Sequence, residues 1–190
     1  LGIRPLVMGR LGDGWVFASE TCALDIVGAT LEREVLPGEI VAIDQHGLRS
    51  VQLPAAEQVH RCVFEHVYFA RPDSKVFGGS VDRSRRALGR QLAIECPAPG
   101  AELVFAVPDS SNSAALGYSE ESGIPYELAL IRNHYIGRTF IQPTQAGRDA
   151  KVKVKYNPVR ELLEGKSVVM VDDSIVRGTT TRGLVSLVRA

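Results

Sequence analysis

The chain has 190 residues and a mass of 20.6 kDa, with 22 Lys and Arg against 22 Asp and Glu, 45% hydrophobic residues and 23% charged residues. This composition is typical of a globular protein and excludes an intrinsically disordered chain, while the length exceeds the roughly 150 residues of one average domain. The balanced charge offers no cationic surface for sequence-independent binding of nucleic acid, so no nucleic-acid partner is predicted.

The two ends of the chain look like cut points. Residues 1–6 carry neither an initiator Met nor the pattern of a signal peptide, and residues 180–190 form a predicted helix that lacks a stop signal. We therefore expect a segment of a longer protein. The longest apolar runs, such as residues 103–107, fall far short of the roughly 18 residues of a membrane helix, so no membrane partner is predicted.

The first 53 residues alternate short apolar stretches with turn residues, which predicts several strands, including 15–18 and 39–43. Residues 19–21 are candidates to cap a short helix over 22–27, and Gly28 suits its end. The segment 54–61 breaks the alternation, and we place a domain boundary there, at residue 58.

From residue 83 onward, predicted helices and strands alternate. A helix is expected over 83–95, with Ala87, Leu88, Leu92 and Ala93 on its packing face. A strand over 103–107, a helix from 114 to 123, strands over 127–131 and 167–171, and a final helix follow. This order predicts an α/β domain with a mainly parallel sheet, whose ligands bind at the carboxyl ends of the strands.

The run from Val168 to Thr180 carries the clearest chemical pattern. An apolar strand is followed by two carboxylates, Asp172 and Asp173, and then by Gly178 at the predicted start of a helix. Hydroxyl donors in this loop are Ser174, Thr179 and Thr180. A helix N-terminus with hydroxyl donors suits a phosphate, and the carboxylates suit sugar hydroxyls or hydrated Mg²⁺. The alternative is a strand end followed by an acidic capping turn.

This run resembles the phosphoribosyl pyrophosphate (PRPP) loop of type I phosphoribosyltransferases, and in its full form that of the amidophosphoribosyltransferase family. Four other segments resemble the family in the same order, namely residues 69–74, 107–111, 123–126 and 135–143. Residues 1–35 are similar to the late part of its glutaminase domain. The resemblance implies a truncated type I phosphoribosyltransferase sheet over 59–190, preceded in 1–58 by the end of an N-terminal-nucleophile glutaminase.

The resemblance also implies site residues. It assigns PRPP binding to Asp172, Asp173, Ser174, Ile175, Val176, Arg177, Gly178, Thr179 and Thr180. It places Mg²⁺ near Asp172, Asp173 and Ser110, and Ser110 precedes a predicted helix whose N–H groups could meet an anion. On its own, the cluster Asp109-Ser110-Ser111 would more often be a simple helix N-cap than an anion site.

The long polar stretch 132–148 resembles a loop of the family that closes over PRPP. Its candidate residues are Arg132, Asn133, Tyr135, Arg138 and Gln142. Lys is common in the family where this chain has Arg132, and Arg is common where it has His134. Arg132 keeps the charge with a different hydrogen-bond geometry, whereas His134 can be neutral near pH 7.

The three cysteines, Cys22, Cys62 and Cys96, include no Cys-x-x-Cys pair, which favours a reducing, cytoplasmic setting over a disulfide framework. Cys62 matches one cysteine of the iron–sulfur branch of the family. A [4Fe–4S] cluster needs four ligands, so this chain alone should bind none. The alternative for Cys62 is a buried apolar role, which we also expect for Cys22 and Cys96.

The implied function of the parent protein is synthesis of 5-phosphoribosylamine from PRPP and glutamine-derived ammonia, the first step of de novo purine synthesis. The expected ligands are PRPP, glutamine and pyrophosphate with Mg²⁺, and the family resemblance adds purine nucleotide inhibitors and a homo-oligomer. Leu1 cannot serve as the glutaminase nucleophile, so none is assigned. Alternatives are a non-catalytic PRPP-binding regulator, or a phosphoribosyltransferase for a purine or orotate base.

Overall fold

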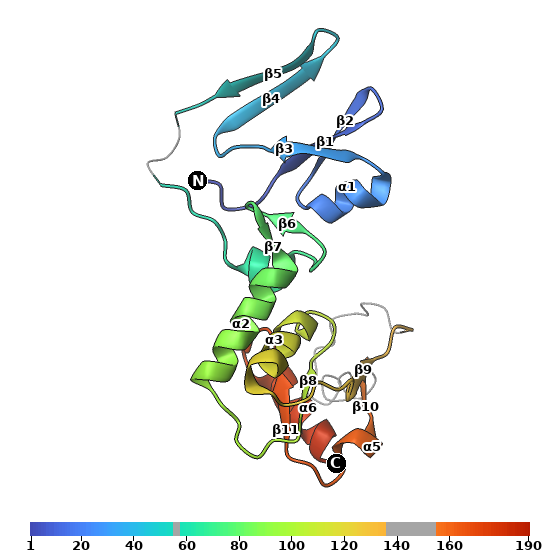
Figure 1. Ribbon diagram of the computed structural model, residues 1–190. Helices are drawn as coiled ribbons and strands as arrows, with labels where there is room; N and C mark the ends of the chain where they lie inside the picture. Colours follow the sequence, from blue (N-terminus) through green and yellow to red (C-terminus); the bar gives the residue numbers. More distant parts are fainter. Residues whose placement is uncertain (55–57, 136–154) are drawn as a thin grey trace. The chain divides into compact units, whose positions relative to one another are not determined.

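The computed structural model describes residues 1–54, 58–135 and 155–190 (Figure 1). These residues form two compact units, Leu1–Ser84 and Arg85–Ala190. The functional boundary at residue 58 stays a prediction. Among the described residues, no helix has both the length and the apolar character that crossing a bilayer requires.

The first unit is strand-rich, as its alternating sequence predicts. Its three-stranded antiparallel sheet has the order β2-β1-β3, and a hairpin, β4–β5, follows. The strands are β1 (Val7–Leu11), β2 (Gly14–Ala18), β3 (Thr30–Glu34), β4 (Glu39–Asp44), β5 (Gly47–Gln52), β6 (Lys75–Val76) and β7 (Gly79–Ser80). A single π-helical turn, η1 (Glu65–Phe69), precedes β6.

Helix α1 (Thr21–Val27) confirms the short helix predicted in this unit, and Gly28 ends it in the left-handed conformation at φ 73°. The predicted side-chain cap is absent. The carboxylate of Glu20, at the N-cap position, instead accepts hydrogen bonds from the backbone N–H of Arg71 at 2.7 Å and from the Ser74 hydroxyl at 2.9 Å. Both of these long-range bonds end on Oε2 of Glu20.

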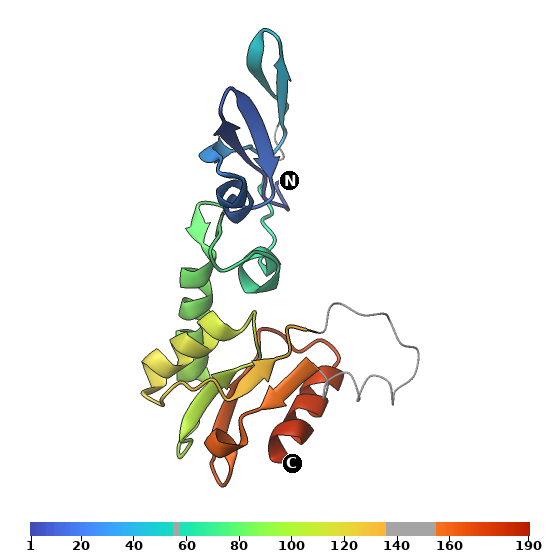
Figure 2. The same cartoon turned by 90° about the vertical axis from the view of Figure 1, so that its right-hand side faces the viewer.

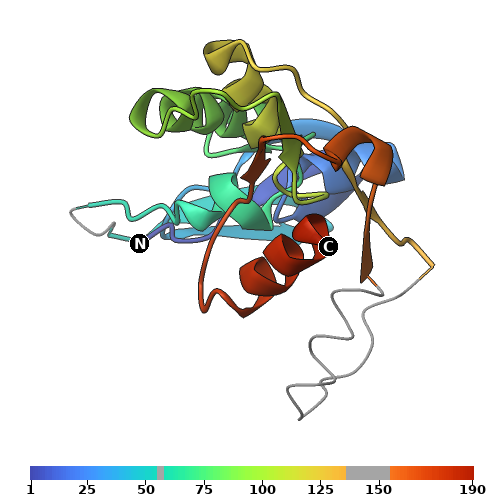
Figure 3. The ribbon, with the colours of Figure 1, turned by 90° about the horizontal axis from the view of Figure 1, so that it is seen from below.

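The second unit is built around two parallel strands, β8 (Leu103–Ala106) and β11 (Val168–Val171). Figures 2 and 3 show the strands between helices α2 and α3 on one side and α6 on the other. These helices are α2 (Val81–Glu95), which begins in the first unit, α3 (Asn112–Ser122) and α6 (Thr179–Arg189). The short elements β9 (Leu130–Arg132), β10 (Tyr156–Pro158) and α5 (Arg160–Leu163) complete the unit.

Alternation along β8 explains these two layers. Leu103 and Phe105 join the core that contains Leu184 of α6, whereas Val104 and Ala106 join the core that contains Ala115 of α3. Each residue of β8 is buried because both faces of this strand are covered, which is typical of parallel sheets. The unit is therefore an α/β layer structure, as the alternating elements predict.

The packing face predicted for α2 is wrong. Leu88 and Leu92 are exposed, and of the predicted residues only Ala93 is buried. The helix packs instead through Arg85, Gly89 and Ala93. A Cβ at position 89 would lie 1.9 Å from the carbonyl oxygen of Ala114, so this close approach to α3 requires a glycine.

The strand predicted over 127–131 is displaced. Tyr126 forms only an isolated parallel bridge with Val104, through the carbonyl of Pro125 and the N–H of Glu127. The chain then leaves β8, and β9 pairs antiparallel with β10. The sheet is thus parallel at β8 and β11, but β9 runs in a separate two-stranded ladder because its partner comes from the chain after residue 155.

Candidate functional site

The carboxyl ends of β8 and β11 lie side by side. Val171 pairs with Ala106, and the N–H of Val107 donates to the carbonyl of Val171 at 2.9 Å. The chain leaving β11 at Asp172 therefore meets the chain leaving β8 at Pro108, where the Pro108–Asp109 peptide bond is cis. Parallel strand ends of this kind are the usual ligand sites of α/β sheets.

Asp172 is fixed at this junction by two donors to one carboxylate oxygen. The N–H of Asp173 donates to Oδ1 at 2.9 Å, and the hydroxyl of Ser111 donates to the same atom at 3.3 Å. Burial raises the pKa of Asp172 and the charge of Asp173 adds to the rise, whereas both hydrogen bonds lower it, with a net upward shift. Among the described residues, no hydrogen bond to Oδ2 is found.

The loop after Asp172 leads into a helix N-terminus. The Ser174 hydroxyl donates to Oδ1 of Asp173 at 2.6 Å, while Ile175 and Val176 are exposed. Gly178 takes the left-handed conformation at φ 67° and occupies the N-cap of α6, whose predicted start is confirmed. The first N–H groups of α6 lack partners within the helix, which is the arrangement that binds a phosphate.

The loop after β8 carries the predicted residue Ser110 and two residues that the sequence analysis missed. Ser111 is completely buried and reaches Asp172, and Arg85, 2% exposed, donates from Nη1 to the carbonyl of Ser110 at 3.3 Å. Ser111 could have been found as the serine adjacent to the predicted one. Nothing in the periodicity of α2 marks Arg85, because a cation there suggests an exposed face.

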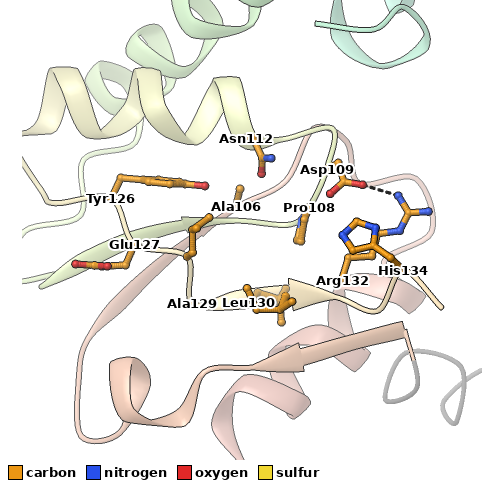
Figure 4. Close-up of a pocket in the computed structure, with 12 residues that line it drawn as sticks. Ala106, Pro108, Asp109, Asn112, Tyr126, Glu127, Ala129, Leu130, Arg132 and His134 are labelled. Atoms are coloured by element: carbon orange, nitrogen blue, oxygen red, sulfur yellow. Dashed lines mark hydrogen bonds and ion pairs between the residues drawn. The ribbon is translucent and has the colours of Figure 1, made fainter. Parts of the chain in front are cut away.

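A cavity of ≈ 130 Å³ lies beside this loop. At its edge, Nη1 of Arg132 lies 2.6 Å from Oδ2 of Asp109, and Figure 4 shows the two side chains facing each other. Tyr126 and Asn112 line the side nearest α3, and Leu130 lines the opposite side (Figure 4). Arg132 from the predicted closing loop thus contacts the loop that follows β8.

Other residues of the predicted closing loop are only partly described. Oδ1 of Asn133 accepts a hydrogen bond from the N–H of Tyr135 at 3.0 Å, and Tyr135 is 99% exposed. His134 lines the cavity. Arg138 and Gln142 lie outside the described residues.

The donor set at the strand ends suits magnesium. Within the described ranges, no group of three or more His, Cys, Asp or Glu side chains is placed to hold a metal ion. Mg²⁺, however, usually takes one or two carboxylates and fills its remaining positions with water and substrate phosphates. Asp172 and Asp173 supply two carboxylates, and the hydroxyl of Ser110 stands in the neighbouring loop.

The cysteines and histidines form no comparable site. Cys62 is half-buried, Cys22 is buried as predicted, and the prediction of a packing role for Cys96 is wrong because its side chain is exposed. Cys96 directly follows α2, and its carbonyl accepts a hydrogen bond from the Tyr118 hydroxyl of α3 at 2.8 Å, but its side chain points away from this contact and is exposed. One matching thiol of the four needed does not make an iron–sulfur site.

Comparison with known proteins gives close matches over part of their length. The chain is 56% identical over 189 residues to the chloroplastic amidophosphoribosyltransferase of Vigna aconitifolia and 54% identical over 188 residues to the amidophosphoribosyltransferase of Bacillus subtilis. In both cases the match covers 99% of this chain and 39% of the relative. No model of a protein family matches the chain.

Solved structures agree with these matches. The chain superimposes with a TM-score of 0.89 and 53% identity on a structure described as the allosteric regulatory enzyme of purine biosynthesis, and covers 40% of it. The same TM-score and identity relate it to the glutamine PRPP amidotransferase of B. subtilis in complex with ADP and GMP, of which it covers 41%. In both comparisons 99% of this chain is matched.

Proposed function

Because the chain is homologous over 99% of its length to part of the amidophosphoribosyltransferases, we propose that it supplies the PRPP and magnesium site of such an enzyme. The observation that supports this most directly is the junction of two loops at neighbouring parallel strand ends. One loop carries Asp172 and Asp173 and runs into the N-terminus of α6, and the other carries Ser110. The chain spans about two fifths of these relatives, so the reaction belongs to a longer protein.

In the proposed reaction, ammonia released from glutamine by hydrolysis attacks C1 of PRPP. The bond from C1 to the pyrophosphate oxygen breaks, a proton leaves the new amine, and 5-phosphoribosylamine, glutamate and pyrophosphate are the products. A bound Mg²⁺ would neutralise charge that develops on the departing pyrophosphate. The transfer step as proposed requires no covalent bond between a side chain and the substrate.

The residues of the second unit bind and orient PRPP in this proposal. Residues 174–180, with the first N–H groups of α6, hold the 5-phosphate. Asp172 and Asp173 hold the ribose hydroxyls, and with Ser110 they would ligate Mg²⁺ at the pyrophosphate end. Holding the sugar at both ends fixes C1 for attack. Less translational and rotational entropy is then lost when the transition state forms.

The remaining roles follow from the resemblance. Residues 132–148, with Arg132, Asn133, Tyr135, Arg138 and Gln142, form the loop that closes over PRPP and excludes water, a competitor of ammonia. Residues 1–58 end the glutaminase domain, and residues 59–190 begin the phosphoribosyltransferase domain. Purine nucleotides are proposed inhibitors, since the B. subtilis structure contains ADP and GMP. A homo-oligomer and a cytoplasmic location complete the proposal.

The test replaces both carboxylates, Asp172→Asn with Asp173→Asn, in the full-length protein. We expect formation of 5-phosphoribosylamine from PRPP and ammonia to fall by at least about 100-fold, which is the usual order of loss when an enzyme loses substrate positioning and charge stabilisation. Hydrolysis of glutamine should continue. Synthesis is measured by the formation of 5-phosphoribosylamine, and hydrolysis by the formation of glutamate.

The control is Glu161→Gln with Glu164→Gln, which removes two exposed carboxylates from the same unit and should leave both reactions unchanged. Retained synthesis in the Asp172 and Asp173 variant would refute the loop assignment. A full-length protein that binds PRPP yet forms no phosphoribosylamine would favour the regulator, and one that uses a purine or orotate base would favour another phosphoribosyltransferase.

A further inference from the structure

The second serine of the β8 loop, Ser111, stands at a helix start without capping the helix. It occupies the N-cap position of α3, where a serine hydroxyl ordinarily accepts a hydrogen bond from an N–H of the first turn. Here the backbone at φ −90° and ψ −3° is not extended, and no side-chain cap bond forms. The hydroxyl is therefore available for another partner.

That partner lies 61 residues away in the sequence. The Ser111 hydroxyl donates to Oδ1 of Asp172 at 3.3 Å, and Ser111 is completely buried. In ligand-free sites such hydrogen bonds are often long and shorten when the substrate binds. A buried hydroxyl that gives up a local cap for a distant carboxylate links the two loops of the site directly.

The geometry leaves one carboxylate oxygen of Asp172 for a ligand. Oδ1 receives both described donors, the Ser111 hydroxyl and the N–H of Asp173, while no donor to Oδ2 is found among the described residues. Two donors on one oxygen restrict rotation of the carboxylate, because turning it would break both bonds. The two bonds thereby hold the whole carboxylate in one orientation, in which Oδ2 accepts no hydrogen bond from a described residue.

We propose that Ser111 is a positioning residue for PRPP binding, which orients the carboxylate of Asp172 and ties the loop after β8 to the loop after β11. This inference rests on the proposed function of the site. Ser111 acts through Asp172, whereas Ser110 is the serine predicted to face the substrate. Residues that orient a ligating carboxylate in this way typically contribute 10–100-fold to affinity or activity.

The experiment compares Ser111→Ala and Ser111→Cys with the parent in the full-length protein. Both variants should raise the KM for PRPP about 10-fold in the ammonia-dependent reaction, with kcat within about 3-fold, because the contact serves the bound substrate and the transition state alike. Direct titration with PRPP and Mg²⁺ should show the same loss of affinity.

The cysteine variant separates donation from packing. A thiol fills the site of the hydroxyl but donates only weakly, so a packing role predicts that cysteine restores the KM that alanine raises. Ser119→Ala is the control, since it removes the hydroxyl that donates to the carbonyl of Ile124 at 2.6 Å near the other end of α3. It should leave the KM for PRPP unchanged.

Three outcomes would overturn the inference in an active parent protein: an unchanged KM in Ser111→Ala, full restoration by Ser111→Cys, or an equal rise in Ser119→Ala. A parent protein that neither binds PRPP nor forms phosphoribosylamine would instead refute the proposed function. Failure of the positioning role and failure of the proposed function are therefore distinguishable. The positioning role is supported only if the KM for PRPP rises in both Ser111 variants and stays unchanged in Ser119→Ala.

Discussion

Glu39 shows how strongly single residues of the first unit are fixed. Its side chain is 4% exposed and forms a two-point ion pair with Arg33, at 2.6 Å and 2.9 Å. The Ser50 hydroxyl and the N–H of Leu36 also donate to it. The bond from Arg33, followed by those from Ser50 and Leu36, lowers the pKa of Glu39 from 4.5 to about 2.

This shift predicts a loss of stability in acid. Because the pKa in the folded state lies below the ordinary value of 4.5, the stabilisation is complete above that value and is lost as the pH falls toward about 2. Between about pH 5.5 and 3.5, the free energy of unfolding should fall by about 1 kcal/mol more in the parent than in Glu39→Gln. Urea denaturation at each pH measures this difference.

The control is Glu32→Gln, an exposed position of β3, which should keep the pH dependence of the parent. Equal changes of the free energy of unfolding with pH in the parent and in Glu39→Gln would contradict the prediction.

Arg85 and Ser111 illustrate what a residue pattern cannot reveal about the candidate site. Asp172 and Asp173 could be predicted because an apolar strand leads directly to them. Arg85 could not, since its burial depends on the loop after β8 folding back to offer the carbonyl of Ser110. Ser111 reads locally as a helix cap, and only the pairing of β8 with β11 brings Asp172 within its reach.

At the level of elements, the contact of α2 with α3 is made by glycines. A Cβ at Gly89 would lie 1.9 Å from the carbonyl oxygen of Ala114, and one at Gly117 would lie 2.1 Å from that of Arg86. Each helix therefore brings its backbone against the other. This explains why the packing face predicted for α2 is wrong. Apolar periodicity detects large apolar side chains, and it overlooks a helix contact that glycines make.

Gly89→Ala tests this contact. In an exposed helix the change would stabilise by up to about 1 kcal/mol, but here the methyl group must push two backbones apart, and overpacking costs about 1–3 kcal/mol. We expect a net loss of at least about 1 kcal/mol in urea denaturation of the full-length protein. Gln91→Ala, which changes an exposed position of the same helix, should be nearly neutral. A Gly89→Ala protein as stable as the parent would rule out the close approach.

The element order of the second unit could be predicted because helix and strand periods alternate clearly, whereas strand partners could not. The strand predicted over 127–131 is displaced to β9, which pairs with β10 across a long connection. Pairing at such a sequence distance leaves little trace in local composition. The meeting of the carboxyl ends of β8 and β11 was predictable for a different reason, since parallel strands always bring these ends to one edge, and it is there that the candidate site is proposed.

At the scale of the whole molecule, the site is assembled from loops that are distant in sequence and adjacent in space. Ser111 and Asp172 meet because β8 and β11 are parallel neighbours, so the proposed PRPP site lies within one compact unit. The segment that resembles a glutaminase lies in the other unit. We therefore expect substitutions at Asp172 and Asp173 to separate synthesis from glutamine hydrolysis, as two chemistries carried by different parts of a longer chain.

The iron–sulfur prediction also belongs to the longer chain. Cys62 stands where the chain enters η1; its N–H donates to the carbonyl of Ile3 at 3.1 Å, and its thiol is half-buried. Because a [4Fe–4S] cluster needs four thiolates, Cys62 could ligate one only together with cysteines that lie outside this 190-residue sequence. In full-length protein purified without oxygen, Cys62→Ser should remove the visible cluster absorbance and most of the bound iron. Cys96→Ser, which changes an exposed thiol in the other unit, should retain both. Iron content that is unchanged in Cys62→Ser, or absent from the parent, would refute the ligand assignment.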